Sequence, residues 1–484
     1  MKKLLIAAPK SGSGKTILTC GMLELLKRKN IPTASFKCGP DYIDPLFHKR
    51  ILGVESRNLD SFFESPEGLL QVFSHGCTGK ETGLALIEGV MGYFDGLAGV
   101  LPQASTYETA EILQAPVILT VDARGSSLSL VALIQGFLSY HPLKKEKIRQ
   151  SESRIKAVVL NQVSPMIYPR LKKLIEEELG ILVAGYIPPL DFLHIESRHL
   201  GLILPDEISD LQEQIRKLAD VMENSLDFDQ LLELAEQEEM RQEHSDKDPE
   251  QKTGGISQKK QNNQNKFCLA VAMDEAFCFY YQENLRAMEE QGAILQYFSP
   301  LHDKRIPEEA DGLLLGGGYP ELYAKKLAEN ETMRNSIFQA AKHGMPIHGE
   351  CGGYLYLLEQ LQGADEAYYP MCGVFSGSGT KGKRLGNFGY ITLKARRDTA
   401  FFKGKSEIRA HEFHYWKVEK TAEQQEKMLM DAEKPASEKR WSAMEEQGYA
   451  LAGFPHFYYR SCPEFTERFA AACLEYQRVR RHFT

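Results

Sequence analysis

The segment APKSGSGKT, residues 8–16, constrains the fold of this chain more than any other feature. It follows a short apolar run that predicts a buried strand over Lys3–Ala8, and it precedes an amphipathic stretch that predicts a helix over Lys15–Lys29. A strand, a glycine-rich turn and a helix in this order form the phosphate-binding loop of α/β nucleotide-binding proteins. The glycine that usually opens the motif is replaced by Pro9, but the Gly-Lys-Thr that closes it is intact. We therefore expect a parallel α/β domain that binds ATP.

The last five residues of this loop have distinct expected roles. Backbone N–H groups around Gly12, Ser13 and Gly14 can converge on phosphate oxygens, because glycine permits the close approach and the dihedral angles that this requires. Lys15 is expected to reach the β- and γ-phosphates of ATP, and the hydroxyl of Thr16 is expected to bind Mg²⁺. The positive end of the following helix points at the same anion.

Two acidic clusters follow predicted strands. Glu88 ends the apolar run LALIE, so we expect its carboxylate to emerge beside the nucleotide as a second Mg²⁺ ligand. Asp41 and Asp44 follow the strand predicted over Thr33–Lys37, close enough to share a metal ion or one substrate, and Asp95 lies in a glycine-rich loop after Glu88. The alternative is that each acid is a solvated turn residue or a helix cap, and this alternative is weakest for Glu88.

The rest of the chain predicts two doubly wound α/β domains. Further strands are expected at Leu84–Glu88, Val117–Val121, Ala157–Asn161 and Ile181–Ile187, and a further helix at Pro169–Leu179. Residues 236–266 are rich in Glu, Gln, Lys and Asn and nearly devoid of large apolar residues, which is typical of a solvated linker. A second α/β series then begins near Cys268. We therefore expect one domain over residues 1–235, a polar linker over 236–266 and a second domain over 267–484.

The second domain contains the pattern of a nucleophile elbow around Cys351. In PIHGECGGY, residues 346–354, a short buried strand leads to the cysteine and two glycines, and YLYLLEQL predicts a helix after them. A thiol at such a turn lies near a helix N-terminus, so we expect its pKa to be lowered from about 8.5. Backbone N–H groups of Gly352 and of Gly317, in the GGG run at another strand end, are expected to form an oxyanion hole.

A cysteine nucleophile needs a histidine that is distant in sequence and adjacent in space. The candidates are His343, His348, His411, His414 and His456. His348 stands three residues before the nucleophile and is expected to be structural, whereas HEFHYW, residues 411–416, predicts a strand with one decorated face. A lone histidine is most often a satisfied structural group, so the residues alone favour His456 without excluding the others.

Composition excludes several other classes of protein. The net charge of −8 argues against a nucleic-acid partner, because phosphate binding needs a basic surface. No apolar stretch approaches the roughly 18 residues that span a bilayer, and the apolar start is interrupted at Pro9 and Lys10. We therefore expect a cytoplasmic protein without membrane association. The nine cysteines include no CxxC pair, which predicts neither a disulfide framework nor a zinc site.

These motifs resemble those of the cobyrinate a,c-diamide synthase family, the corrinoid amidotransferases of cobalamin biosynthesis. The resemblance runs nearly end to end and rests on APKSGSGKT, FKCGPDYIDP, NLDSFF and IEGVMGYFDG in the first half, and on GGGYPEL, HGECGGYLYL, HEFHYW and PHFYYRSCP in the second. It implies a P-loop domain similar to dethiobiotin synthetase, followed by a flavodoxin-like class I glutamine amidotransferase domain. It also implies that glutamine and MgATP are used to convert the a and c carboxylates of a corrinoid to amides, through an acyl phosphate.

The resemblance implies a role for each matching residue. Cys351 would be the glutaminase nucleophile, His456 would raise its nucleophilicity, Lys15 and Thr16 would bind ATP and Mg²⁺, Glu88 would assist the metal, and Asp41, Tyr42, Asp44 and Asp95 would line the corrinoid and acyl-phosphate site. Class I glutaminases generally have a glutamate two residues after the histidine, where this chain has Tyr458. The cobyrinate and cobyric acid branch is similar in lacking it, so the group that orients His456 is left unidentified.

Several alternatives stay open at this point. Nickel-sirohydrochlorin a,c-diamide synthase would share nearly every motif, whereas cobyric acid synthase is disfavoured by the GPDYIDP and EGVMGYFDG loops. From a different class, a partitioning-type ATPase switch would be favoured by Lys10, which has the position of the signature lysine of deviant Walker loops, although a solvent-facing lysine explains it better. Such a switch would not need the Cys351 elbow. The sequence also leaves open whether the chain forms a homodimer and which carboxylate reacts first.

Overall fold

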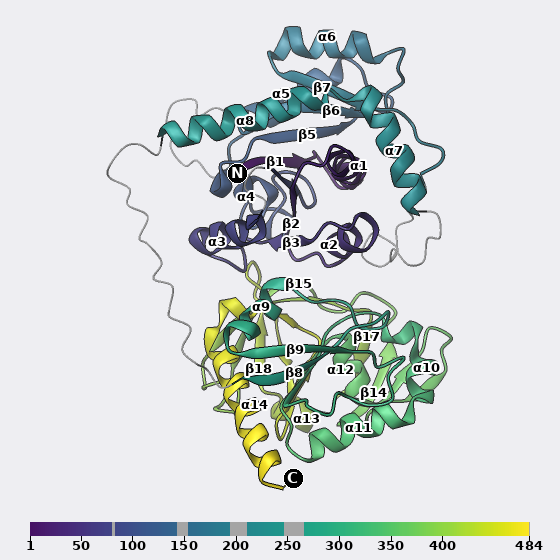
Figure 1. Cartoon of the computed structure of the whole chain (residues 1–484), viewed down its shortest axis with the longest axis vertical. Coiled ribbons are helices and arrows are strands. Elements are labelled where there is room, and N and C mark those ends of the chain that lie inside the picture. The colour runs from purple at the N-terminus through teal and green to yellow at the C-terminus, as the bar shows by residue number, and fades with distance from the viewer. Residues whose placement is uncertain (80–82, 143–152, 194–210, 246–265, 484) are drawn as a thin grey trace. The chain divides into compact units, whose positions relative to one another are not determined.

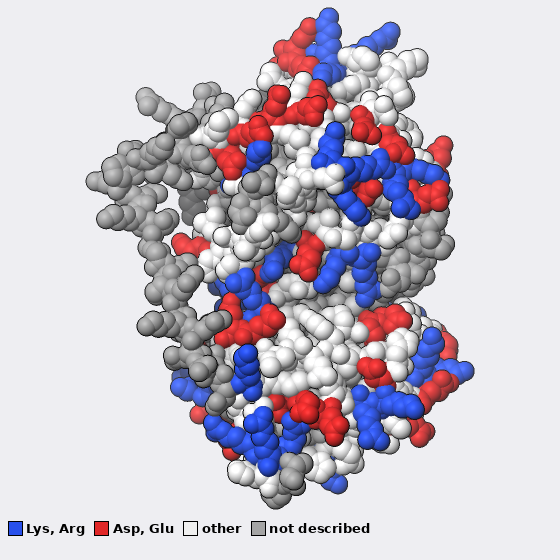
Figure 2. All heavy atoms as spheres, in the orientation of Figure 1, with Lys and Arg blue, Asp and Glu red and all other residues white. Residues whose placement is uncertain are grey.

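The computed structural model describes residues 1–79, 83–142, 153–193, 211–245 and 266–483 (Figure 1). It divides into two compact units, Met1–Ser257 and Gln258–Thr484. Among the described helices none is long and apolar enough to cross a membrane. On the face drawn in Figure 2, Lys and Arg side chains are interspersed with Asp and Glu over the described surface of both units.

The first unit is built on a seven-stranded parallel sheet with the order β3-β2-β4-β1-β5-β6-β7. The strands are β1 (Lys2–Ala7), β2 (Thr33–Cys38), β3 (Ser56–Leu59), β4 (Leu84–Glu88), β5 (Val117–Asp122), β6 (Ile155–Asn161) and β7 (Leu182–Ile187). The six predicted strands are confirmed to within two residues at each end. The edge strand β3 was not predicted, because Ser-Arg-Asn-Leu carries no apolar run.

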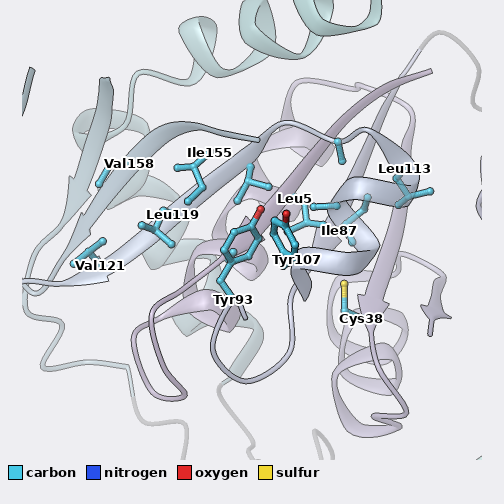
Figure 3. Packing of buried hydrophobic residues seen from close by; sticks show 14 of the residues in the cluster. Leu5, Cys38, Ile87, Tyr93, Tyr107, Leu113, Leu119, Val121, Ile155 and Val158 are labelled. Carbon is cyan, nitrogen blue, oxygen red and sulfur yellow. The ribbon is translucent and has the colours of Figure 1, made fainter. Parts of the chain in front are cut away.

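Helices cover both faces of this sheet. They are α1 (Lys15–Arg28), α2 (Ile43–Phe47), α3 (Pro66–Cys77), α4 (Thr106–Leu113), α5 (Ser129–Ser139), α6 (Tyr168–Leu179), α7 (Leu211–Ser225) and α8 (Phe228–Ser245). Successive side chains of a strand point to opposite faces. Accordingly Leu5 of β1 packs with α3 to α6 in the core that Figure 3 shows, whereas Leu4 packs with α1, α7 and α8 in the opposite core. The predicted doubly wound fold is confirmed.

The end of the first unit differs from the sequence prediction. A polar linker is predicted from residue 236, whereas α8 continues to Ser245. Glu, Gln, Met and Arg favour helix even without apolar neighbours. Tertiary contacts stabilise this segment as well, since the N-terminal ammonium of Met1 pairs with Glu239 at 2.5 Å and Lys2 pairs with Glu236. Residues 246–265 of the predicted linker lie outside the described residues.

The second unit is built on a six-stranded sheet with the order β20-β21-β11-β10-β8-β9, parallel except for β20. The strands are β8 (Phe267–Ala272), β9 (Ala293–Phe298), β10 (Gly312–Leu315), β11 (Ile347–Glu350), β20 (Glu445–Gln447) and β21 (Ala450–Gly453). The helices are α9 (Gln282–Glu290), α10 (Ala324–Glu329), α11 (Glu331–Lys342), α12 (Gly352–Leu357), α13 (Ala422–Lys427) and α14 (Pro463–Phe483). Leu315 packs with α10 and α11 on one face, and Leu314 packs with α9 and α14 on the other, so this unit is doubly wound as predicted.

Two smaller sheets extend the second unit. A four-stranded sheet contains β12 (Leu358–Gln362), β13 (Tyr368–Pro370), β14 (Phe375–Lys381) and β17 (Trp416–Val418), and a five-stranded antiparallel sheet contains β15 (Phe388–Ala395), β16 (Glu407–Phe413), β18 (Met430–Glu433), β19 (Arg440–Ala443) and β22 (His456–Phe457). The helix predicted from YLYLLEQL therefore ends at Leu357, and the rest of that segment is β12. The spacing of Leu358 and Leu361 suits a helix, but pairing with β13 and β14 determines the outcome.

Candidate functional site

The phosphate loop of the first unit joins β1 to α1. Gly12 and Gly14 have φ values of 77° and 103°, which favour glycine. Gly14 also has no room for a side chain, because a Cβ atom there would lie 2.3 Å from Nδ2 of Asn161. That amide, at the end of β6, donates a hydrogen bond of 3.0 Å to the carbonyl oxygen of Ser13. The backbone N–H groups of the loop are therefore held in place from a neighbouring strand end.

Lys15 is turned toward the loop that follows β4. Its ammonium donates a hydrogen bond of 2.5 Å to the carbonyl oxygen of Met91. Burial lowers the pKa of Lys15 to about 8, and repulsion by the ammonium of Lys37 adds to the effect. An anion in the loop would stabilise the charged form of both lysines, so this arrangement suits a phosphate ligand.

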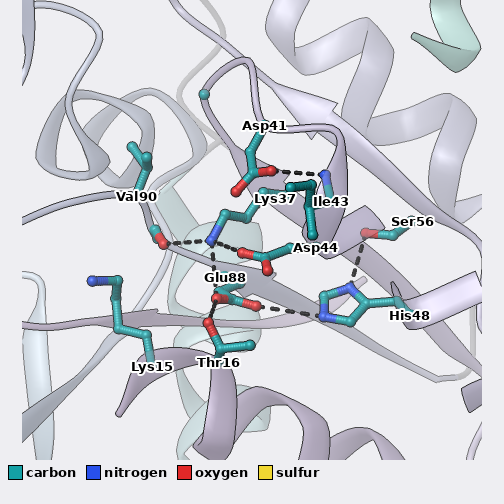
Figure 4. A network of polar contacts seen from close by, with 12 residues as sticks. Lys15, Thr16, Lys37, Asp41, Ile43, Asp44, His48, Ser56, Glu88 and Val90 are labelled. Carbon is teal, nitrogen blue, oxygen red and sulfur yellow. Dashed lines mark hydrogen bonds and ion pairs between the residues drawn. The ribbon is translucent and has the colours of Figure 1, made fainter. Parts of the chain in front are cut away.

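Lys37 is the centre of a buried polar cluster, which we define as Thr16, Lys37, Asp44, His48 and Glu88 (Figure 4). The Lys37 ammonium contacts the carboxylate of Asp44 and lies 2.9 Å from Oε1 of Glu88. Thr16 donates a hydrogen bond of 2.6 Å to the same Glu88 oxygen. On the other side of that carboxylate, Nε2 of His48 lies 3.4 Å from Oε2. The ends of β2 and β4 thus meet the start of α1, as the sequence predicts for Thr16 and Glu88.

The charges of the Lys37 cluster differ in how firmly they are held: Lys37 and Glu88 form an ion pair, whereas the charge of Asp44 depends on what binds beside it. Burial opposes the charge on Lys37 and on Glu88, but the carboxylates of Asp44 and Glu88 raise the pKa of the lysine, and the Lys37 ammonium lowers the pKa of Glu88. Burial and the nearby Glu88 charge raise the pKa of Asp44 instead. Among the described residues, Oδ1 of Asp44 has no hydrogen-bond partner. A cation bound there would favour ionisation of Asp44.

The cluster has the oxygen ligands that Mg²⁺ prefers, which usually include only one or two carboxylates together with phosphate and water. Thr16, Asp44 and Glu88 supply one hydroxyl and two carboxylates. Consistently, the described residues contain no group of three or more His, Cys, Asp and Glu side chains that could hold a metal by themselves. The donor set therefore fits Mg²⁺ bound together with ATP.

The other acids of this edge have local roles in the structure. Oδ1 of Asp41 accepts a hydrogen bond of 2.8 Å from the N–H of Ile43, and Oδ2 of Asp95 accepts one of 3.1 Å from Gly92. Each therefore stabilises its own turn, as the structural alternative expects. Asp44 differs from these two acids because its side chain is buried in the Lys37 cluster, where it is only 3% exposed. Tyr42 is buried as well.

Sequence reasoning assigned no specific role to three polar residues at this edge. Lys37 and Asn161 were expected as strand-end residues that could do chemistry, whereas His48 carried no signal at all. A lysine inside the apolar strand TASFKC is unusual enough to indicate a paired functional group. No local pattern marks His48, which reaches Glu88 only through the tertiary fold.

The elbow of the second unit is formed by β11, Cys351 and α12. Cys351 has φ 49° and ψ −98°, a strained conformation for a residue other than glycine. Its N–H donates to the carbonyl oxygen of Gly453 at 2.7 Å, which holds the turn against β21. A Cβ atom on Gly352 would lie 3.1 Å from the backbone nitrogen of Gly318 and 3.4 Å from the carbonyl carbon of Gly317. The two segments predicted to supply the oxyanion hole are therefore adjacent.

His456 lies at the same place, on β22. This strand pairs with β16, which puts His456 opposite His411. A Cβ atom on Gly317 would lie 2.4 Å from Cε1 of His456, so the imidazole packs directly on the turn that borders the elbow. The Cys351 sulfur lies 3.8 Å from the carbonyl oxygen of Phe413, at the end of β16. The Cys351 elbow and His456 thus both border the Gly317 turn.

The remaining histidines have other surroundings. Nε2 of His348 contacts Glu350 at 2.9 Å, Nε2 of His414 contacts Glu412 at 2.8 Å, and the exposed His343 contacts the carbonyl oxygen of Gln339 at 2.7 Å. His411 is inside the strand predicted from HEFHYW, and burial lowers its pKa to about 3. His414 lies between β16 and β17, outside that strand.

The expected lowering of the Cys351 pKa is wrong for this structure. Burial raises the pKa of the thiol, and the carboxylates of Glu321 and Glu412 raise it further. Because α12 has only six residues, its dipole offsets little of that cost. Glu321, in the GGGYPEL segment, is itself buried, and burial raises its pKa to about 7. A neutral thiol of this kind needs a base to remove its proton, and His456 is the adjacent candidate.

Comparison with known proteins assigns the chain to a family. The CobQ/CobB/MinD/ParA nucleotide binding domain matches residues 4–202, and the CobB/CobQ-like glutamine amidotransferase domain matches residues 268–462. A cobyrinate a,c-diamide synthase of Caldanaerobacter subterraneus subsp. tengcongensis is 35% identical over 475 residues, which cover 98% of this chain and 99% of the relative. One of Listeria innocua serovar 6a is 37% identical over 465 residues, which cover 96% and 97%. The chain therefore belongs to the cobyrinate a,c-diamide synthase family of glutamine-dependent ligases.

Proposed function

We propose that this chain converts the a and c carboxylates of cobyrinic acid to carboxamides, with glutamine as the nitrogen source and MgATP as the energy source. The observation that supports this most is the coverage of its relatives. Similarity to proteins named for this reaction extends over 98% of the chain, and it includes both the phosphate loop and the Cys351 elbow. A partitioning-type switch has less support, because Lys10, the residue that favoured it, is simply exposed.

In the glutaminase half of the reaction, His456 takes the proton of the Cys351 thiol, and the thiolate attacks the carboxamide carbon of glutamine. The oxyanion that forms is stabilised by the N–H groups of Gly352 and Gly317, whose segments lie side by side. His456 then gives its proton to the leaving nitrogen, which departs as ammonia. Water hydrolyses the remaining thioester and releases glutamate. The burial of the thiol is consistent with this order of steps, because a neutral Cys–His pair has a lower desolvation free energy than a thiolate and an imidazolium.

In the synthetase half, an oxygen of the substrate carboxylate attacks the γ-phosphorus of ATP, and ADP leaves. The loop N–H groups and Lys15 hold the phosphate charge that develops, and Lys37 offers a second cation 2.9 Å from Glu88. Mg²⁺, when held by Thr16, Glu88 and Asp44, would neutralise charge on the β- and γ-phosphates. Ammonia then attacks the acyl phosphate carbon and displaces phosphate, which leaves the amide.

The choice of macrocycle is tested by offering the protein three acceptors in parallel. With MgATP and glutamine, cobyrinic acid is expected to yield monoamide and then diamide, identified by mass spectrometry, whereas sirohydrochlorin and its nickel complex yield little. The opposite preference would overturn the substrate assignment and support the alternative diamide synthase. No product from any of the three, with ATP and glutamine left intact, would overturn the proposed reaction class.

The low pKa of Lys15 predicts that ATP binding takes up protons. At pH 8 about half of the Lys15 side chains are neutral in the free protein, and the bound phosphates restore the ammonium form. Titration calorimetry in buffers of different ionisation enthalpy should detect about half a proton taken up per ATP at pH 8. The Lys15→Arg variant is the matched control, since a guanidinium does not titrate in this range. Equal proton uptake by both proteins would show that Lys15 is not the group involved.

A further inference from the structure

Glu350 is a buried carboxylate next to the nucleophile to which the reaction outlined above gives no role. It is the last residue of β11 and is only 4% exposed. Its Oε1 accepts hydrogen bonds from Nε2 of His348 at 2.9 Å and from the N–H of Phe457 at 3.1 Å. Its Oε2 lies 3.7 Å from Nδ1 of His456. One carboxylate therefore contacts both the residue after His456 and the imidazole of His456 itself.

The two ring nitrogens of His456 can have different roles, one as the contact to Glu350 and the other as the acceptor of the Cys351 proton. Nδ1 faces Glu350, and the two ring nitrogens lie on opposite sides of Cε1, the atom that packs on Gly317. Nε2 is therefore the ring nitrogen directed away from Glu350, and it is the one to which we assign the Cys351 proton. The 3.7 Å contact is longer than a normal hydrogen bond, but such contacts are often long before substrate binds and shorten in the reacting complex.

We propose that Glu350 is the positioning residue of the glutaminase: it orients His456 through Nδ1 and stabilises the imidazolium that forms when His456 takes the Cys351 proton. This assignment rests on the proposed function, since it concerns the same glutaminase step. It supplies a carboxylate in place of the glutamate that class I glutaminases generally have two residues after the histidine, where this chain has Tyr458. The carboxylate comes instead from the residue immediately before the nucleophile.

The surroundings of Glu350 keep it ionised and fixed. Burial alone would raise its pKa, but the hydrogen bond from His348 and the nearby His456 ring outweigh burial and lower it to about 2. Burial raises the pKa of Tyr459, and Glu350 raises it further. Another titratable side chain, His411 on β16, lies opposite His456, and burial keeps that ring neutral at working pH. Glu350 therefore carries the negative charge that can respond to the charge on His456.

The test is the Glu350→Gln variant, which keeps one acceptor oxygen for His348 and the Phe457 N–H and replaces the other oxygen and the charge with a neutral NH₂ group. We expect kcat for glutamate release from glutamine to fall roughly 10²-fold with little change in KM. We also expect the acidic limb of the pH profile to move to lower pH, because the imidazolium loses its stabilising partner. Amidation with free ammonia should keep the wild-type rate, and Glu350→Asp should restore part of kcat and the original limb.

The matched control is Asp311→Asn, which neutralises a buried carboxylate at the opposite end of the same sheet, where it is hydrogen-bonded to the N–H of Cys268 and to Gln477. It should leave both the pH profile and glutamate release unchanged. A Glu350→Gln protein with the wild-type pH profile, or one that loses ammonia-dependent and glutamine-dependent activity equally, would overturn the assignment. Glutamate release is measured without any tetrapyrrole, so an error in the proposed acceptor would not be mistaken for an error here.

Discussion

Replacing Cys351 with alanine is expected to reduce glutamine-dependent amidation by at least roughly 10³-fold, because no other group in the elbow can form the thioester. Amidation supported by free ammonia should continue at the wild-type rate, since the phosphate loop and the Lys37 cluster lie in the other unit. The measurement is the rate of amide formation with each nitrogen source at saturating MgATP. The ratio of the two rates isolates the glutaminase step from any general loss of protein.

The matched control for this variant is Cys372→Ala. Cys372 is also a free thiol, but it is buried in the core of the second unit, whereas Cys351 is half-buried at the elbow. With either nitrogen source, amidation by this variant should proceed at the wild-type rate. If Cys351→Ala retained glutamine-dependent amidation, the elbow would not be the glutaminase site. If it lost ammonia-dependent amidation as well, the division of labour between the two units would be wrong.

Replacing Glu88 with glutamine is expected to impair the synthetase step and to leave the glutaminase step intact. Amidation should fall roughly 10²- to 10³-fold with either nitrogen source, because the variant loses the proposed Mg²⁺ ligand and leaves Lys37 with one carboxylate partner instead of two. Glutamate release from glutamine, measured without acceptor, should be unchanged. Breaking a buried ion pair is also destabilising by on the order of 3 kcal/mol, so thermal unfolding must be followed in parallel.

Asp122→Asn provides the comparison for Glu88→Gln. Asp122 ends β5, two positions from β4 in the sheet, and pairs with the exposed Arg124 at 2.7 Å. Its neutralisation should change amidation several-fold at most and stability very little, since surface ion pairs contribute about 0–1 kcal/mol. Wild-type amidation in a folded Glu88→Gln protein would remove Glu88 from the proposed metal site.

The sequence predicted best those parts of the fold that local patterns specify. Central strands of a parallel sheet are apolar on both faces, so runs such as Leu84–Glu88 stand out from their surroundings. The edge strand β3 and the short β12 do not, because their residues become strands only through pairing with distant partners. The same limit explains α8, where helix propensity and ion pairs with the N-terminus hold a polar segment in place.

The candidate sites divide in a similar way. Lys15, Thr16, Glu88 and Cys351 lie in motifs whose chemistry depends on neighbours along the chain, and the structure places each at the expected strand end. The residues that shift the pKa values of these motif residues come from distant parts of the chain. Lys37 and His48 reach Glu88 only in the folded sheet, and Glu350 reaches His456 only because β22 returns beside β11. A sequence motif also does not show how deeply a side chain is buried. Because burial is the largest cause of the raised Cys351 pKa, the direction of that shift was predicted wrongly.

The central claim is that one chain activates a tetrapyrrole carboxylate with ATP and aminates it with nitrogen from glutamine. Its most direct test is to incubate the wild-type protein with cobyrinic acid, MgATP and glutamine labelled with ¹⁵N in the side-chain amide, and to analyse the product by mass spectrometry. We expect a diamide that carries the label in both new amides, with one ADP and one glutamate formed for each. An unlabelled product, or ADP and glutamate formed without any amide, would contradict the account.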